Sequence, residues 1–309
     1  MRARLILGTE ARVLLDASSL IGLEHGRPVS FADLGVILRE QHARLVLTRT
    51  NVLEFSASAA KTGDFPALRR ELLQIERLPV AYLREGGITR SELVEAVAAF
   101  SEHREFAPID PYVERWDETL VLEGPSPAQV LVNQRLDDLV FMLWKHGGLS
   151  VTERRWGRLL KQQFKEDRGL PAGVRKAIRN NFSKALRRHL ALFSILFPED
   201  RVDQLAEWIY DNPMRSPGHR LAYDVRQELM NNLTEAVTAN DISDLAQVEA
   251  VPYVDAITMD RNTADLCRRV SKRLEKKISS VTYQRRIFPS LKDLLDTKSW
   301  KISALRSHP

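Results

Sequence analysis

The stretch Arg12-Val-Leu-Leu-Asp16-Ala-Ser18-Ser19 decides the fold class. Its apolar run ends in an acid and is followed by serines, which predicts a short strand and then the start of a helix. A helix over residues 31–41 and a second strand over residues 43–48 are predicted next. The chain therefore opens with the β-α-β-α alternation of an α/β protein.

The middle of the chain has a different pattern. From about Phe65 to Asn240, apolar residues recur at spacings of three and four, which predicts helices and no strand. Strand signals return over residues 253–259 and 284–288, with a helix between them at residues 263–278. We therefore predict an α/β fold in which both chain ends build a parallel sheet flanked by helices. Residues 10–62 and 238–296 would form this domain, and residues 63–237 a large all-α insertion.

Composition excludes several classes of protein. The chain has 309 residues, of which 44% are hydrophobic, and a single cysteine, Cys267, which we expect in the core. These values exclude collagen, a coiled coil, a disordered chain and a disulfide framework. No run approaches the ~20 apolar residues of a membrane span, so we expect a soluble, cytoplasmic protein with no membrane partner.

The net charge of +5 is unevenly distributed. Residues 153–189 hold twelve Lys and Arg against three acids, and residues 261–286 hold nine against two. Such asymmetry indicates a polyanionic partner, for which nucleic acid is our interpretation, although basic faces that are merely solvated stay an alternative. The cations expected to bind nucleic acid are Arg154, Arg155, Arg158, Lys161 and Arg261, and Trp156 is a candidate for base stacking.

Four acids stand at the end of a predicted strand or early in a predicted helix: Asp16, Glu54, Asp244 and Asp260. Thr50 or Asn51 is expected to cap the helix that carries Glu54. Ligands of open parallel sheets bind beyond the carboxyl ends of the strands, so these side chains could converge. Converging carboxylates repel one another unless a cation lies between them, and an all-oxygen set suits Mg²⁺. The alternative is that the aspartates are only helix caps or turn residues.

The segments that carry these acids resemble a known family. They are Val13-Leu-Leu-Asp16-Ala-Ser18, Thr50-Asn-Val-Leu-Glu54, Asp241-Ile-Ser-Asp244-Leu-Ala and Pro252-Tyr-Val-Asp-Ala-Ile-Thr258-Met-Asp260-Arg261. Together they are similar to the PIN-domain nucleases, over residues 10–62 and 238–296. The chain departs from a minimal PIN domain because 190 residues separate Glu54 from Asp244.

The resemblance implies a metal-dependent nuclease, with RNA a more common substrate than DNA. It implies that Mg²⁺ or Mn²⁺ is held by the catalytic acids Asp16, Glu54, Asp244 and Asp260, with Asp241 either supporting Asp244 or replacing it. Ser18 and Thr258 are expected to orient the carboxylates or bond a phosphate oxygen from behind them. We expect an endoribonuclease. A DNA-cleaving enzyme, and a module that binds nucleic acid or a protein partner without catalysis, are the alternatives. Protein partners and a homo-oligomer also stay open.

Overall fold

The computed structural model describes residues 10–84, 87–113, 140, 175–231, 247–277, 283–297 and 300. This part of the chain is a mixed α/β structure around a six-stranded sheet of order β4-β3-β2-β1-β5-β6. Neighbouring strands run parallel except β3 and β4, which are antiparallel. The strands are β1 (Ala11–Leu14), β2 (Ala43–Leu47), β3 (Val80–Leu83), β4 (Tyr112–Val113), β5 (Ala256–Thr258) and β6 (Ile287–Phe288).

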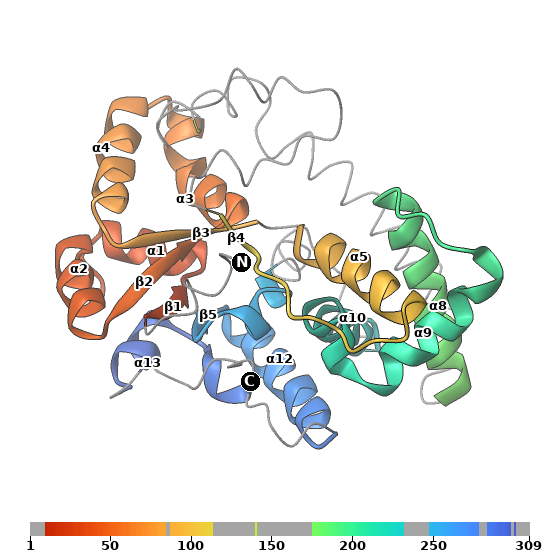
Figure 1. Ribbon diagram of the computed structural model, residues 1–309. Coiled ribbons are helices and arrows are strands. Elements are labelled where there is room, and N and C mark those ends of the chain that lie inside the picture. Colours follow the sequence, from red (N-terminus) through yellow and green to blue (C-terminus); the bar gives the residue numbers. More distant parts are fainter. Residues whose placement is uncertain are drawn as a thin grey trace.

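Helices cover both faces of the sheet (Figure 1). Side chains alternate between the faces along a strand, so Val13 and Leu15 join one core cluster while Leu14 joins the other. The helices of the first face are α1 (Ala17–Glu24), α2 (Phe31–Glu40), α3 (Arg49–Thr62), α4 (Phe65–Glu76) and α13 (Leu291–Leu295). The second face packs against α5 (Gly87–Ser101), α10 (Pro217–Asn231) and α12 (Arg261–Glu275), where the buried Cys267 confirms its predicted core position.

A third cluster of apolar side chains lies among helices on the second side of the sheet. Here α8 (Arg175–Leu192) and α9 (Val202–Asp211) pack with α5 and α10, as Figure 1 shows. Short 3-10 turns complete the described elements: η3 (Glu199–Arg201), η4 (Pro213–Arg215), η5 (Val251–Tyr253) and η6 (Gln284–Arg286). None of the helices in the described ranges is long and apolar enough to cross a membrane.

The expectation of an all-α segment over residues 63–237 is wrong at two places. Strand β3 pairs with β2, and β4 extends the sheet beyond β3. Strand β3 has four residues and β4 has two. In such short apolar runs the spacing of apolar residues does not distinguish a strand from a helix. The sheet therefore includes segments that we had assigned to the insertion, while the division into residues 10–62, 63–237 and 238–296 stays a prediction.

The predicted strands and helices of the chain ends are found, with shifted boundaries. The strand expected over residues 253–259 is confined to β5, and its first expected residue, Tyr253, belongs to turn η5. Strand β6 likewise follows turn η6. Helix α3 is capped by Thr48 and not by Thr50 or Asn51: Asn51 N donates to Thr48 Oγ1 (3.1 Å), and Thr48 N donates to Asn51 Oδ1 (2.8 Å).

A buried carboxylate joins α5 to α10 and to turn η5. Glu92 of α5 is fully buried and accepts hydrogen bonds at the amino end of α10, from Gly218 N (2.7 Å), His219 N (2.8 Å) and Ser216 Oγ (2.9 Å). The hydroxyl of Tyr253 in η5 also donates to it. Burial raises the pKa of Glu92, against the lowering effect of these hydrogen bonds.

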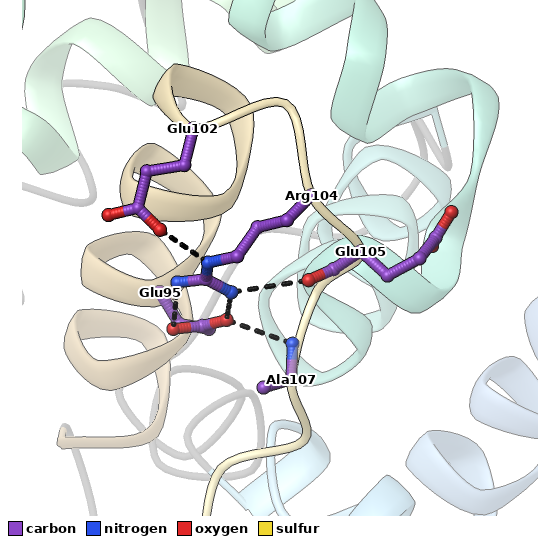
Figure 2. A network of polar contacts seen from close by, with 5 residues as sticks. All are labelled: Glu95, Glu102, Arg104, Glu105 and Ala107. Atoms are coloured by element: carbon purple, nitrogen blue, oxygen red, sulfur yellow. Dashed lines mark hydrogen bonds and ion pairs between the residues drawn. The ribbon is translucent and has the colours of Figure 1, made fainter.

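A network on the protein surface fixes the segment that leaves α5 (Figure 2). The guanidinium of Arg104 contacts both oxygens of Glu95 and donates to Glu102 Oε2 (2.6 Å) and to the carbonyl oxygen of Glu105 (3.2 Å). Glu95 Oε1 also accepts from Ala107 N at 2.9 Å. The chain is thereby turned back toward β4 at the edge of the sheet.

Candidate functional site at the carboxyl ends of β1 and β5

The order in which the strands are added to the sheet reverses between β1 and β5. From β1 the chain adds β2 and β3 on one side, whereas β5 and β6 lie on the other side. The helices that follow β1 and β2 cover one face of the sheet, and α12, which follows β5, covers the opposite face. This is the arrangement that right-handed crossovers produce when the strand order reverses. The crevice at such a reversal is where open α/β sheets bind their ligands.

Asp16 and Asp260 stand on either side of this reversal. Leu14 pairs with Ile257 across the two parallel strands, and each aspartate follows its strand by two residues. A direct contact joins the two strand ends, because Thr258 Oγ1 accepts from Asp16 N (2.9 Å) and donates to Asp16 Oδ1 (2.8 Å). Residues 242 positions apart in sequence are thus held together at one edge of the sheet.

Asp16 caps the helix that follows it. Its Oδ1 accepts from Ser19 N (3.2 Å) as well as from Thr258. Its Oδ2 accepts from the hydroxyl of Ser18 (2.5 Å), an exposed residue. The two hydroxyl residues named by the sequence analysis, Ser18 and Thr258, therefore both contact the Asp16 carboxylate. Because they bind different oxygens, they fix the plane of the carboxyl group.

Asp260 also caps a helix, α12. Its Oδ1 accepts from Asn262 N (2.9 Å) and Thr263 N (3.2 Å), and its side chain is exposed. Arg261 follows as the first residue of α12 and is exposed as well. The alternative of a helix cap is thus correct for Oδ1 of Asp16, and Asp260, for which the alternative was a turn residue, is a helix cap as well.

Glu54 lies in α3, which follows β2, the other neighbour of β1. The start of α3 is tied to the end of β1 because Asn51 Nδ2 donates to the carbonyl oxygen of Leu15 at 3.0 Å. Sequence reasoning treated Asn51 only as a possible cap and missed this contact. The position of Asn51 three residues after Thr48 is the signal of a capping box, but it does not predict the contact with Leu15, which depends on how α3 packs against β1. Glu54 itself is half-buried.

The described acids do not form a metal site by themselves. Within the ranges that the structure describes, no group of three or more His, Cys, Asp or Glu side chains is placed to hold a metal ion. Asp241 and Asp244 lie outside these ranges. The donor chemistry at the strand ends, carboxylates supported by hydroxyls, is the type that Mg²⁺ and Mn²⁺ prefer.

Asp255 directly precedes β5 and therefore lies at the amino ends of β1 and β5, opposite the candidate site. Its Oδ2 accepts from Arg12 N (2.9 Å) at the start of β1. Burial raises the pKa of the Asp255 carboxyl, partly opposed by the charges of Arg286 and Arg12. Arg286 is itself buried and donates to the carbonyl oxygens of Pro252 and Val254. Asp255 is therefore a structural partner of arginines and takes no part in the candidate site.

The structure describes only part of the two basic segments, residues 153–189 and 261–286. Arg154, Arg155, Arg158, Lys161 and Trp156 lie outside the described residues, so their predicted role in nucleic-acid binding stays a prediction. Of the second block, Arg286 is buried and is not available to a partner.

The helix after Pro217 is not a surface helix at its start. His219, Arg220 and Tyr223 are each 2% exposed. The ring of His219 lies against that of His189, with Nδ1 of His189 2.9 Å from Nε2 of His219. Burial and the charge of Arg226 lower the pKa of His189 to about 3. These side chains build the core between α8 and α10.

Comparison of the chain with protein-family models, curated proteins and solved structures finds no match.

Proposed function

We propose that the protein is a Mg²⁺- or Mn²⁺-dependent endonuclease of the PIN-like type, acting on RNA. One observation carries the proposal: Asp16 and Asp260 each follow one of two adjacent parallel strands, β1 and β5, at the point where the strand order reverses. Asp16, Glu54 and Asp260 follow three adjacent parallel strands, and Asp244 or Asp241 is proposed to complete the ligand set.

Each residue has a proposed task. The carboxylates of Asp16 and Asp260 would hold the cation through the oxygens that their caps do not use. Ser18 and Thr258 would keep the Asp16 carboxyl group in one orientation, as their hydrogen bonds to it suggest. A cation bound there lowers the pKa of a water molecule and neutralises charge on the departing oxygen of a phosphodiester. Arg261, exposed beside Asp260, would contact a phosphate oxygen.

The test separates the acid as a ligand from the acid as a helix cap. Asn caps helices about as well as Asp does, so Asp16→Asn and Asp260→Asn should fold normally but lose the negative charge. Asp64→Asn is the matched control, because Asp64 is the exposed cap of α4, where its Oδ1 accepts from Ala67 N. Labelled RNA and DNA are incubated with each protein with and without Mg²⁺ or Mn²⁺, and Mn²⁺ binding is measured by calorimetry.

The expected outcome is metal-dependent cleavage of RNA by the wild type and by Asp64→Asn, and loss of both cleavage and Mn²⁺ binding in the other two variants. Undiminished cleavage by Asp16→Asn would remove this carboxylate from the mechanism. A wild type that binds RNA but cleaves neither nucleic acid with either ion would instead identify a non-catalytic binding module. Cleavage of DNA alone would correct the substrate.

A further inference from the structure

The outer surface of α12 carries a row of cations that leads away from the candidate site. Seven Lys and Arg lie between residues 261 and 277, against the acids Asp265 and Glu275. The opposite surface of the helix is buried through Ala264, Cys267, Val270 and Leu274. The helix begins beside β5, directly after Asp260, and extends away from that strand (Figure 1).

Three of these cations share one line along the helix. A helix turns about 100° per residue, so Arg261, Lys272 and Lys276 point within about 60° of one another. The rise of about 1.5 Å per residue spreads them over roughly 22 Å. All three are exposed, and within the described part of the chain none forms an ion pair with an acid.

The other cations of α12 are engaged with the protein. Arg269 and Arg273 lie 3.9 and 2.7 Å from the carboxylate of Glu228 on α10. Arg268 donates to the carbonyl oxygen of Ile287 (2.6 Å) and lies 3.6 Å from Asp265, the one acid on the exposed line. Arg261, Lys272 and Lys276 therefore form a line of exposed cations on this helix that no ion pair among the described residues engages.

We propose that Arg261, Lys272 and Lys276 form a track for the phosphate backbone of single-stranded nucleic acid, which leaves the candidate site along α12. This inference rests on the proposed function, because it assigns the path of the proposed substrate. A line of separated point charges suits a flexible strand whose phosphates repeat along it, and the track starts next to the acids. Asp265, with its charge only partly offset by Arg268, weakens this track.

The test measures binding without catalysis. A labelled 20-nucleotide oligo-U and the matching oligo-dT are titrated with the full chain in EDTA at several salt concentrations. The variant is the triple substitution Arg261→Gln, Lys272→Gln and Lys276→Gln. Each phosphate neutralised on a single strand contributes about 0.7 to the slope of log K against log salt, so three lost contacts reduce the slope by about 2. At 0.1 M salt this corresponds to roughly a hundredfold weaker binding, with 1 M salt as the reference.

Two further variants make the result specific. Arg39→Gln, Arg70→Gln and Arg77→Gln together remove the same charge from exposed positions at α2 and α4, which cover the opposite face of the sheet. This control should keep the wild-type slope. Asp265→Asn should bind more tightly than the wild type, a gain that no folding defect can imitate.

The outcomes distinguish the track from the nuclease. A triple variant with unchanged slope, or a control that loses as much as the triple variant, overturns the track even if the wild type cleaves RNA. A lost slope in a protein that cleaves nothing supports the track and refutes the nuclease. Binding to phosphatidylserine vesicles that depends on these cations, without binding to either oligonucleotide, also overturns the track in favour of a membrane surface.

Discussion

The hydroxyl of Thr258 allows a sharp test of how the two halves of the sheet are joined. Thr258 is fully buried, and its Oγ1 accepts from Asp16 N, donates to Asp16 Oδ1 and lies 3.1 Å from Ser19 Oγ. Thr258→Val keeps the shape of the side chain and removes all three contacts. Thr258→Ser keeps the hydroxyl and removes only a methyl group.

The structure predicts a definite order of stability for these two variants. Valine leaves the buried N–H of Asp16 without its acceptor, which costs about 1–3 kcal/mol, and removes a hydrogen bond to a carboxylate, worth about 1.5–3 kcal/mol. Because the carboxylate keeps its contacts with Ser18 and Ser19, we expect a total loss of about 2–4 kcal/mol. Serine loses about 1 kcal/mol for one buried methyl group.

Urea denaturation followed by circular dichroism measures both free energies of unfolding. The expected order is wild type, then Thr258→Ser, then Thr258→Val. If Thr258 acts only by filling space, the order of the variants reverses, because valine matches the volume of threonine. Valine equal to or more stable than serine would therefore refute the hydrogen-bonded link between β5 and Asp16.

Other contacts give predictions of the same kind. In urea titrations, Glu92→Gln should lower the free energy of unfolding by about 1–3 kcal/mol, because either orientation of the amide places its NH₂ group against one backbone N–H of α10. The exposed control Glu40→Gln should change it by no more than about 0.5 kcal/mol. Since burial raises the pKa of Glu92, the difference in unfolding free energy between the wild type and Glu92→Gln should shrink as pH rises above about 4.5. Arg104→Ala should speed amide hydrogen exchange at Ala107, because it releases the Glu95 carboxylate that accepts from Ala107 N. The lowered pKa of His189 should make the wild type about 2 kcal/mol less stable at pH 5 than at neutral pH; a curve equally steep in His189→Phe would contradict this.

The parts of the fold that the sequence predicts are those with a local signal. The run before Asp16 is apolar on both faces, as a strand in the middle of a parallel sheet requires. The helix after β5 has apolar residues at positions 264, 267, 270 and 274, the spacing of one buried face. The placement of Asp16 and Asp260 at strand ends followed from these elements.

The parts that it did not predict depend on contacts between distant segments. Glu92 lies within an ordinary helical pattern, and its partners are 124 to 161 residues away. The strands β3 and β4 are too short to show the two-residue period of apolar side chains. Strand β4 is defined by its antiparallel pairing with β3, a contact between separate segments. Asp255 and Asp260 are five residues apart yet face opposite edges of the sheet, since β5 runs between them.

Helix capping and the proposed cation binding, which the sequence leaves as competing roles for the aspartates, would use different oxygens of the same carboxyl groups. Asp16 caps α1 with Oδ1, and its Oδ2 accepts from the hydroxyl of the exposed Ser18, which can rotate. Asp260 caps α12 with Oδ1, and no hydrogen bond to Oδ2 is found among the described residues. A cap fixes the rotamer of its side chain, and a ligand held in one rotamer loses less entropy when it binds a cation. Capping by these two residues therefore favours a cation site at the strand ends.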